Sequence, residues 1–336
     1  MKRGMGRVFL LLLLITTSVY GFGQNVDSLF TLYSQSKGAQ RIKVANEIAQ
    51  ATYELECTDT LYVLSGKESP QHTDAIVYEL LSSYETYALD DYRRGIASAL
   101  KSAGFYMQIG DTVSSDIMYY NTANFYSRTG DYEHAIELLL RCYEIEKQMN
   151  NTVALSHTLN SMGVIYSQWG QSEIAIKYFL ESLEYERPLN RPMQYATRLS
   201  SLAKEYLLLG QNREALTLIQ EALAYDEKIA RNEREERVAV HLNVLGDIYA
   251  AMDSLAQAED CFRSSIEVFE RNNRQQPHAE ALLSLGRLHL RQHRLPEAIE
   301  TLKSCAGINL RAAKSLKKSM PDFCYYMNVE VLLYRF

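Results

Sequence analysis

One pattern of small and apolar residues returns along most of the chain. A small residue marks the same place in each copy, at intervals of 40, 40, 40, 43 and 40: Gly95, Ala135, Ala175, Ala215, Ala258 and Ala298. A period of this size is typical of arrays in which no single unit can bury its own apolar face, so that neighbours stack on one another. We therefore expect a helical repeat array.

The segment 155–187 shows what one unit contains. Small and apolar residues three and four positions apart form one stripe of a first helix: Leu159, Met162, Gly163 and Tyr166. Gly170 interrupts this stripe, and Ser172 is placed to cap a second helix. The segment therefore predicts a helical hairpin.

The order of these residues resembles the tetratricopeptide repeat, whose signature is Leu-Gly-x-x-Tyr followed by Ala-x-x-x-Phe. Two units carry it most clearly, with Met162-Gly163-x-x-Tyr166 before Ala175-x-x-x-Phe179, and Leu245-Gly246-x-x-Tyr249 before Ala258-x-x-x-Phe262. The resemblance implies an all-α, right-handed superhelical solenoid of antiparallel helix pairs. Because the period exceeds the family's length of about 34 residues, we expect long helices.

The pattern divides the chain into four parts. They are a signal peptide (1–23), an N-terminal helical cap or degenerate repeat (24–74), a solenoid of six units of which the first is degenerate (75–318), and the first helix of an incomplete further repeat (319–336).

The first residues predict export. Lys2, Arg3 and Arg7 precede the apolar run 8–15, and small and polar residues follow up to Gly23, which is the order of a secretory signal peptide. The alternative is an anchoring helix, but the run is shorter than the roughly 20 residues that span a bilayer. We expect cleavage after Gly23 and a periplasmic location. Membrane contact is expected only if the chain is part of a longer receptor.

Charge and chemistry narrow the function further. Cleavage would change the net charge from −6 to −9, and an acidic chain is a poor partner for nucleic acid. The five cysteines match no metal or disulfide framework, so we interpret Cys142 and Cys305 as core residues and leave disulfide pairing open. Neither a nucleophile with its base nor a phosphate-binding glycine loop is visible. We expect no catalysis and no cofactor.

A histidine pair could hold a metal ion. His289 and His293 lie four residues apart, as do paired ligands on one helix face. However, His289 occupies the place that Tyr166 and Tyr249 fill in their units, and no third ligand stands nearby. We therefore expect core packing and no metal site.

In the family, ligands contact the concave face of the first helices. Projected onto this chain, that face supplies the predicted peptide-binding residues Tyr84, Tyr120, Asn124, Asn160, Lys204, Asn243, Arg287 and Arg291. Asparagine amides can both donate to and accept from a peptide backbone, and the cations can pair with a carboxylate. Two alternatives stay open: the asparagines are ordinary surface residues, and the cations pair with nearby acids of their own helices.

These observations predict a non-catalytic scaffold, exported to the periplasm, that binds a protein or peptide through a concave groove. The alternative is the sensor portion of a membrane-bound signal-transduction protein, truncated before its transmembrane and output domains. What the gene encodes after residue 336 separates the two.

Overall fold

The computed structural model describes residues 26–58 and 62–319, and every regular element in these ranges is helical. None of the described helices combines the length and the apolar character needed to cross a membrane. Residues 26–35 form the first helix, followed by α2 (Gly38–Glu54), α3 (Pro70–Ser83), the π-helical turn η1 (Tyr84–Ala88), α4 (Tyr92–Gln108), α5 (Thr112–Arg128), α6 (Tyr132–Gln148), α7 (Thr152–Gln168), α8 (Ser172–Glu186), the 3-10 turn η2 (Arg187–Leu189), α9 (Pro192–Leu208), α10 (Asn212–Asp226), α11 (Arg231–Ala251), α12 (Leu255–Arg271), α13 (Gln275–Arg291) and α14 (Leu295–Ser319).

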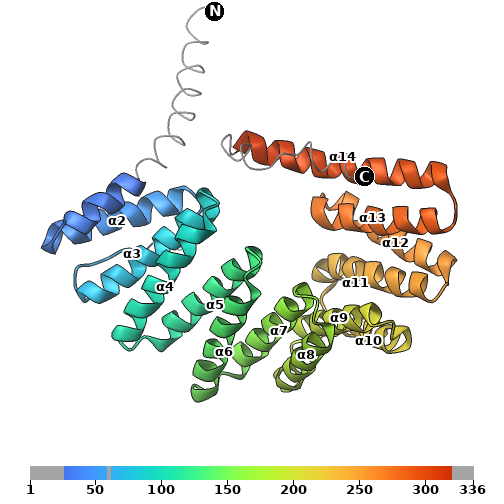
Figure 1. Cartoon of the computed structure of the whole chain (residues 1–336), viewed down its shortest axis with the longest axis horizontal. Helices are drawn as coiled ribbons and strands as arrows, with labels where there is room; N and C mark the ends of the chain where they lie inside the picture. The colour runs from blue at the N-terminus through green and yellow to red at the C-terminus, as the bar shows by residue number, and fades with distance from the viewer. Residues whose placement is uncertain (1–25, 59–61, 320–336) are drawn as a thin grey trace, which may run out of the picture. The chain divides into compact units, whose positions relative to one another are not determined.

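The chain divides into two compact units, residues 1–165 and residues 166–336. In the first unit, α3 packs on α4, α4 on α5, and α5 on α6 (Figure 1). In the second unit, each helix from α8 to α14 packs on the next, and α11 also contacts α9 and α13. In the second unit, the first helices α9, α11 and α13 therefore lie next to one another. The predicted all-α fold of stacked antiparallel helix pairs is confirmed.

Residues with left-handed backbone conformation lie in many of the turns between helices. Gly170 has a φ of 77°, which glycine adopts without the steric penalty of a side chain, and the chain turns there as predicted. This turn places Gln171 at the N-cap of α8, where its carbonyl oxygen accepts from the Ala175 amide at 3.0 Å. The expectation that Ser172 caps α8 is wrong, because Ser172 is already the first residue of the helix.

The recurring alanines lie where the helices come closest. Ala135, Ala175, Ala215, Ala258 and Ala298 are all fully buried. Glycines of the first helices allow an equally close approach. A Cβ atom on Gly246 would stand 2.6 Å from the ring of Phe262, and one on Gly286 would stand 2.7 Å from Leu302. The second helix of each of these pairs therefore packs its large side chain against bare backbone of the first.

The cysteines at this level of the repeats are core residues, as expected. Cys142 and Cys305 are buried, and each thiol donates to a backbone carbonyl, that of Asp116 at 3.5 Å and that of Ala279 at 3.2 Å. Cys142 and Cys305 are free thiols, as are Cys57 and Cys261.

Helices also precede the repeats, within the part predicted to be a cap. Buried residues of helix 26–35, of α2 and of α3 share one core cluster. Helix α3 begins before residue 75, because Ser69 caps it by accepting from the His72 amide at 3.1 Å and Pro70 occupies its first turn. The predicted signal peptide and residues 320–336 of the predicted last helix lie outside the described residues.

We expect Gly246→Ala to lower the free energy of unfolding by about 1–3 kcal/mol, because the added methyl group overlaps the Phe262 ring. Gly307→Ala in α14 is the matched control, since beyond its chain neighbours and the nearby backbone of its own helix no atom lies within 4 Å of the added methyl group. Removing this helical glycine should stabilise the chain by up to about 1 kcal/mol. Urea unfolding measures both. Equal effects of the two substitutions would contradict the close contact.

Candidate functional site

The structure distributes the predicted peptide-binding residues over both units. Tyr84, Tyr120, Asn124 and Asn160 belong to the first unit, and Lys204, Asn243, Arg287 and Arg291 belong to the second.

Tyr84 does not lie on a surface, contrary to its predicted role. Its side chain is 1% exposed and shares a core cluster with Val26 and Leu29 of the first helix. Burial raises the pKa of its phenol to about 12. The projection placed Tyr84 on an open face because it did not account for the helices 26–35 and α2, which cover the first repeat. A ligand cannot reach this residue in the folded chain.

The other three residues of the first unit are half-buried. The Tyr120 hydroxyl makes a hydrogen bond of 2.7 Å with the Ser161 hydroxyl, so this side chain links α5 to α7. Asn160 differs, because its side-chain oxygen is inaccessible to solvent and has no hydrogen-bond partner. No hydrogen bond joins Tyr120, Asn124 and Asn160 to one another in the part of the chain that the structure describes, so these predicted residues do not form one connected site.

In the second unit, charged side chains of α9, α11 and α13 come together. Asp247 of α11 accepts a hydrogen bond from Ser284 of α13 and is attracted by Lys204 of α9 and Arg287 of α13. Burial raises the pKa of Asp247, and these three interactions offset only part of that effect. Lys204 and Arg287 are exposed and make no hydrogen bond or ion pair with any described residue. Two available cations thus flank one half-buried carboxyl group.

A small cavity of about 180 Å³ opens beside Asp247. Its lining combines charged, hydroxyl and apolar groups from three helices: Asp247, Ala250, Phe262, Ser284, Arg287, Leu288 and Arg291. One turn before Asp247 on α11, the side-chain oxygen of Asn243 is inaccessible to solvent and unpartnered. The sequence analysis predicted Arg287 and Asn243 as site residues but missed Ser284. In the sequence, only its position three residues before Arg287, on the same helix face, could have indicated Ser284.

Arg291 is engaged within the protein. Its guanidinium donates to the carbonyl oxygen of Ala250 and forms an ion pair of 3.0 Å with Asp253 in the turn after α11. The cation therefore compensates the C-terminal end of α11. It is a weaker candidate for a ligand carboxylate than Lys204 or Arg287, and its partner is an acid of a neighbouring helix end, not one of its own helix.

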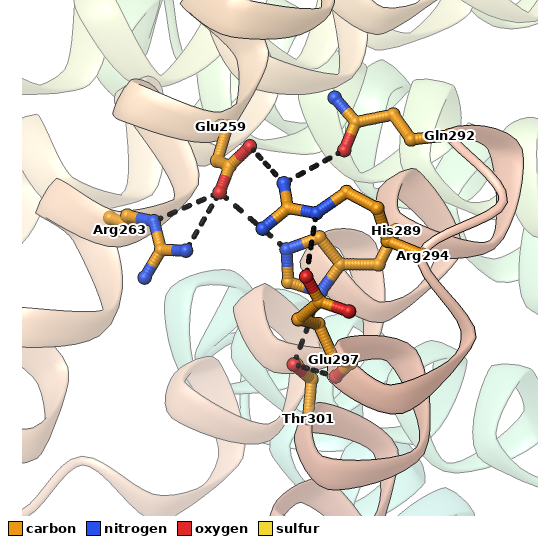
Figure 2. Close-up of polar contacts among 7 residues, drawn as sticks. All are labelled: Glu259, Arg263, His289, Gln292, Arg294, Glu297 and Thr301. Carbon is orange, nitrogen blue, oxygen red and sulfur yellow. Dashed lines mark hydrogen bonds and ion pairs between the residues drawn. The ribbon is translucent and has the colours of Figure 1, made fainter.

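A polar network ties together the last two helix pairs (Figure 2). Glu259 accepts from Arg263 at 2.7 Å on one oxygen and from Arg294 at 2.8 Å on the other, and Arg294 also donates to Glu297 at 3.0 Å. Burial raises the pKa of Glu259, but the hydrogen bonds and charges of the two arginines outweigh it and hold the pKa below its usual value. The carboxylates and guanidinium groups of this network therefore satisfy one another's hydrogen bonds.

His289 lies at the edge of the same network. Its side chain is buried, with Nε2 3.6 Å from Glu259 and Nδ1 3.3 Å from the Thr301 hydroxyl. His293 lies in the turn before α14 with a φ of 58°. Core packing of His289 is confirmed, and the described residues contain no group of three side chains that could hold a metal ion.

The stacked helix pairs define an all-helical repeat protein, and its second unit carries charged side chains on α9, α11 and α13. Residues 114–185 and 236–309 match the tetratricopeptide repeat family model. The helix pairs in these two segments are therefore tetratricopeptide repeats. No curated protein is significantly similar to it.

Several solved structures share the fold. The apo form of RapI is similar with a TM-score of 0.60 and 13% identity, over 88% of this chain and 99% of that one. A signal transduction ATPase from Pyrococcus horikoshii with a tetratricopeptide repeat sensor has a TM-score of 0.56 and 16% identity, over 88% of this chain and 42% of that one. BtubC from P. vanneervenii has a TM-score of 0.54 and 19% identity, over 67% and 92%. Identities this low establish a common fold.

We expect Glu259→Gln to lower the free energy of unfolding by about 1–3 kcal/mol at pH 7, because Arg263 and Arg294 lose their shared carboxylate. A carboxyl group whose pKa is depressed stabilises the fold above its unfolded pKa and stops doing so as pH falls through the folded value. The difference between variant and wild type should therefore shrink below about pH 4.5. Chemical denaturation at each pH measures the free energy of unfolding, and Glu267→Gln on the exposed side of α12 is the control. A loss of stability in Glu259→Gln that does not change with pH would contradict the role given to the Glu259 carboxylate.

Proposed function

We propose that the chain is a non-catalytic scaffold that binds a protein or peptide through the face formed by α9, α11 and α13. The single observation that carries this proposal is the pair of unpartnered cations, Lys204 and Arg287, on either side of Asp247. Arg287 lines the cavity beside Asp247 and Lys204 lies on the neighbouring first helix, so two exposed cations are available to a ligand at this face.

The chemistry of this face favours a carboxylate-bearing segment. Arg287 can hold a carboxylate through two parallel hydrogen bonds, and Lys204 adds a second positive charge. Burial raises the pKa of Asp247, the carboxyl group between these two cations. One turn away, Asn243 offers its amide nitrogen as a donor to the backbone of the same segment, since its oxygen is inaccessible.

Export and signalling extend this proposal. The first 23 residues support a periplasmic location, through the signal-peptide pattern of three cations, an apolar run and small residues. The second candidate is the sensor portion of a longer signal-transduction protein. It is supported by the similar fold of the Pyrococcus horikoshii protein, whose repeats are described as a sensor.

Replacing Lys204 and Arg287 with alanine should weaken binding by roughly tenfold for each cation, because each supplies a charge-assisted hydrogen bond. The probe is a random peptide library prepared with free and with amidated C-termini, and fluorescence anisotropy measures the selected peptides. We expect selection of carboxylate-bearing peptides by the wild-type chain. Arg213→Ala on α10, an exposed cation of a second helix, should leave their affinity unchanged. Equal affinity of the double variant would exclude this face.

Expression of the complete gene in a Gram-negative host tests export. Mass spectrometry of the periplasmic fraction should find a chain that starts at Gln24, and Leu12→Arg should leave the precursor in the cytoplasm because it breaks the apolar run. Wild-type protein found uncleaved in the cytoplasm would contradict the proposal.

A further inference from the structure

Three buried acids end successive second helices at the same place in their repeats. Glu146, Glu186 and Asp226 lie 40 residues apart and are 3%, 1% and 0% exposed. In each case the next first helix brings a residue of matching register against the acid: Thr158, Arg198 and His241. The three sites can therefore be compared directly, each within its own unit.

Two of these acids, Glu186 and Asp226, have arginine or histidine side chains as partners. Glu186 accepts from Arg191 through both oxygens, at 2.8 and 2.7 Å, and Arg198 approaches to 3.2 Å. Asp226 lies 2.6 Å from His241, and Arg237 approaches its other oxygen to 3.5 Å. The positive charges that approach these carboxylates offset the cost of burying them.

The first site lacks such a cation. Thr158 donates to one oxygen of Glu146 at 2.7 Å, and the other oxygen has no hydrogen-bond partner. Among the described residues, no lysine, arginine or histidine forms an ion pair with Glu146. A neutral hydroxyl thus stands where Arg198 and His241 stand in the later repeats, and a buried carboxylate without a counter-charge is costly.

The surroundings increase this cost. From α5, Asp116 contributes a second negative charge, and one of its oxygens is also inaccessible and unpartnered. From α6, the Cys142 thiol donates to the backbone oxygen of Asp116, and burial raises the pKa of this thiol so that it stays neutral. From α7, Thr158 is the facing polar group. The groups that face Glu146 are therefore acidic or neutral.

We propose that the contact of α6 with α7 around Glu146 is a pH-sensitive joint, tight while this carboxyl group holds its proton and loosened when the proton is lost. At the other two sites of this series, arginine or histidine faces the carboxylate.

The direction of the effect follows from linkage. Burial raises the pKa of Glu146 to about 7, and the Asp116 charge acts in the same direction, whereas the Thr158 hydrogen bond lowers it. Below the ordinary glutamate pKa, both the folded and the unfolded chain hold the proton, so stability does not change. As pH rises towards 7 the unfolded chain releases the proton first, and the first unit loses stability. The loosening is complete above neutral pH.

Hydrogen exchange of the full chain tests the joint. At pH 8, Glu146→Gln should increase the protection of α6 and α7 amides about tenfold or more, because each unit of raised pKa corresponds to a tenfold change in equilibrium. At pH 4.5 the gain should vanish. Wild-type and variant chains are compared at the same pH, which cancels the intrinsic dependence of exchange on pH.

Glu186→Gln is the matched control from the same register. It should reduce protection of α8 and α9 at both pH values, because Arg191 and Arg198 lose their carboxylate. Equal protection of the wild-type and Glu146→Gln chains at pH 8, or a gain of the same size at pH 4.5, would overturn the proposal. If the Glu146→Gln chain does not fold, hydrogen exchange of the wild-type chain at the two pH values is the test. Unchanged stability of α7 between pH 4.5 and pH 8 would then overturn the proposal.

Discussion

The close approach of the two helices in each pair is the contact on which the rest of this structure depends. Phe262 occupies the space that a side chain at Gly246 would fill, and Leu302 does the same at Gly286. Dispersion forces act over short distances, so a shift of one ångström at this contact removes much of its attraction. With that spacing fixed, each further pair can stack on the exposed side of the last one, and residues of equal register meet in successive repeats.

This regularity makes polar exceptions visible. Ile96, Ile136, Ile176 and Leu216 hold one position of the second helices, and Glu259 occupies it in the later pair. His289 replaces a tyrosine in the first helix that faces it. His289 lies beside Glu259, so the two polar residues face one another. A carboxylate at an otherwise apolar position also needs hydrogen-bond donors, which Arg263 and Arg294 provide. In this pair, hydrogen bonds and ion pairs therefore hold the two helices together at a place where apolar contacts do so in the earlier repeats.

How much could be predicted from the sequence depended on the range of each interaction. The buried alanines and the turn at Gly170 follow from local spacing, and they were predicted. Tyr84 could not be placed correctly, since the helices that cover it come from a part of the chain with no repeat pattern. Arg291 was assigned to a ligand because its partner, Asp253, lies 38 residues away in a turn. The pocket beside Asp247 could not be predicted either, because its lining comes from separate helices whose packing the sequence does not state.

The two unpartnered cations are explained by the same stacking rule. Lys204, Asp247 and Arg287 hold equal register on three neighbouring helices, so the spacing of helix axes, about 8–10 Å, separates their backbones. At that spacing each cation attracts Asp247 without closing an ion pair, as the electrostatic contacts without a salt bridge indicate. Lys204 and Arg287 therefore stay unpaired among the described residues, and this is the feature on which the proposed binding face rests.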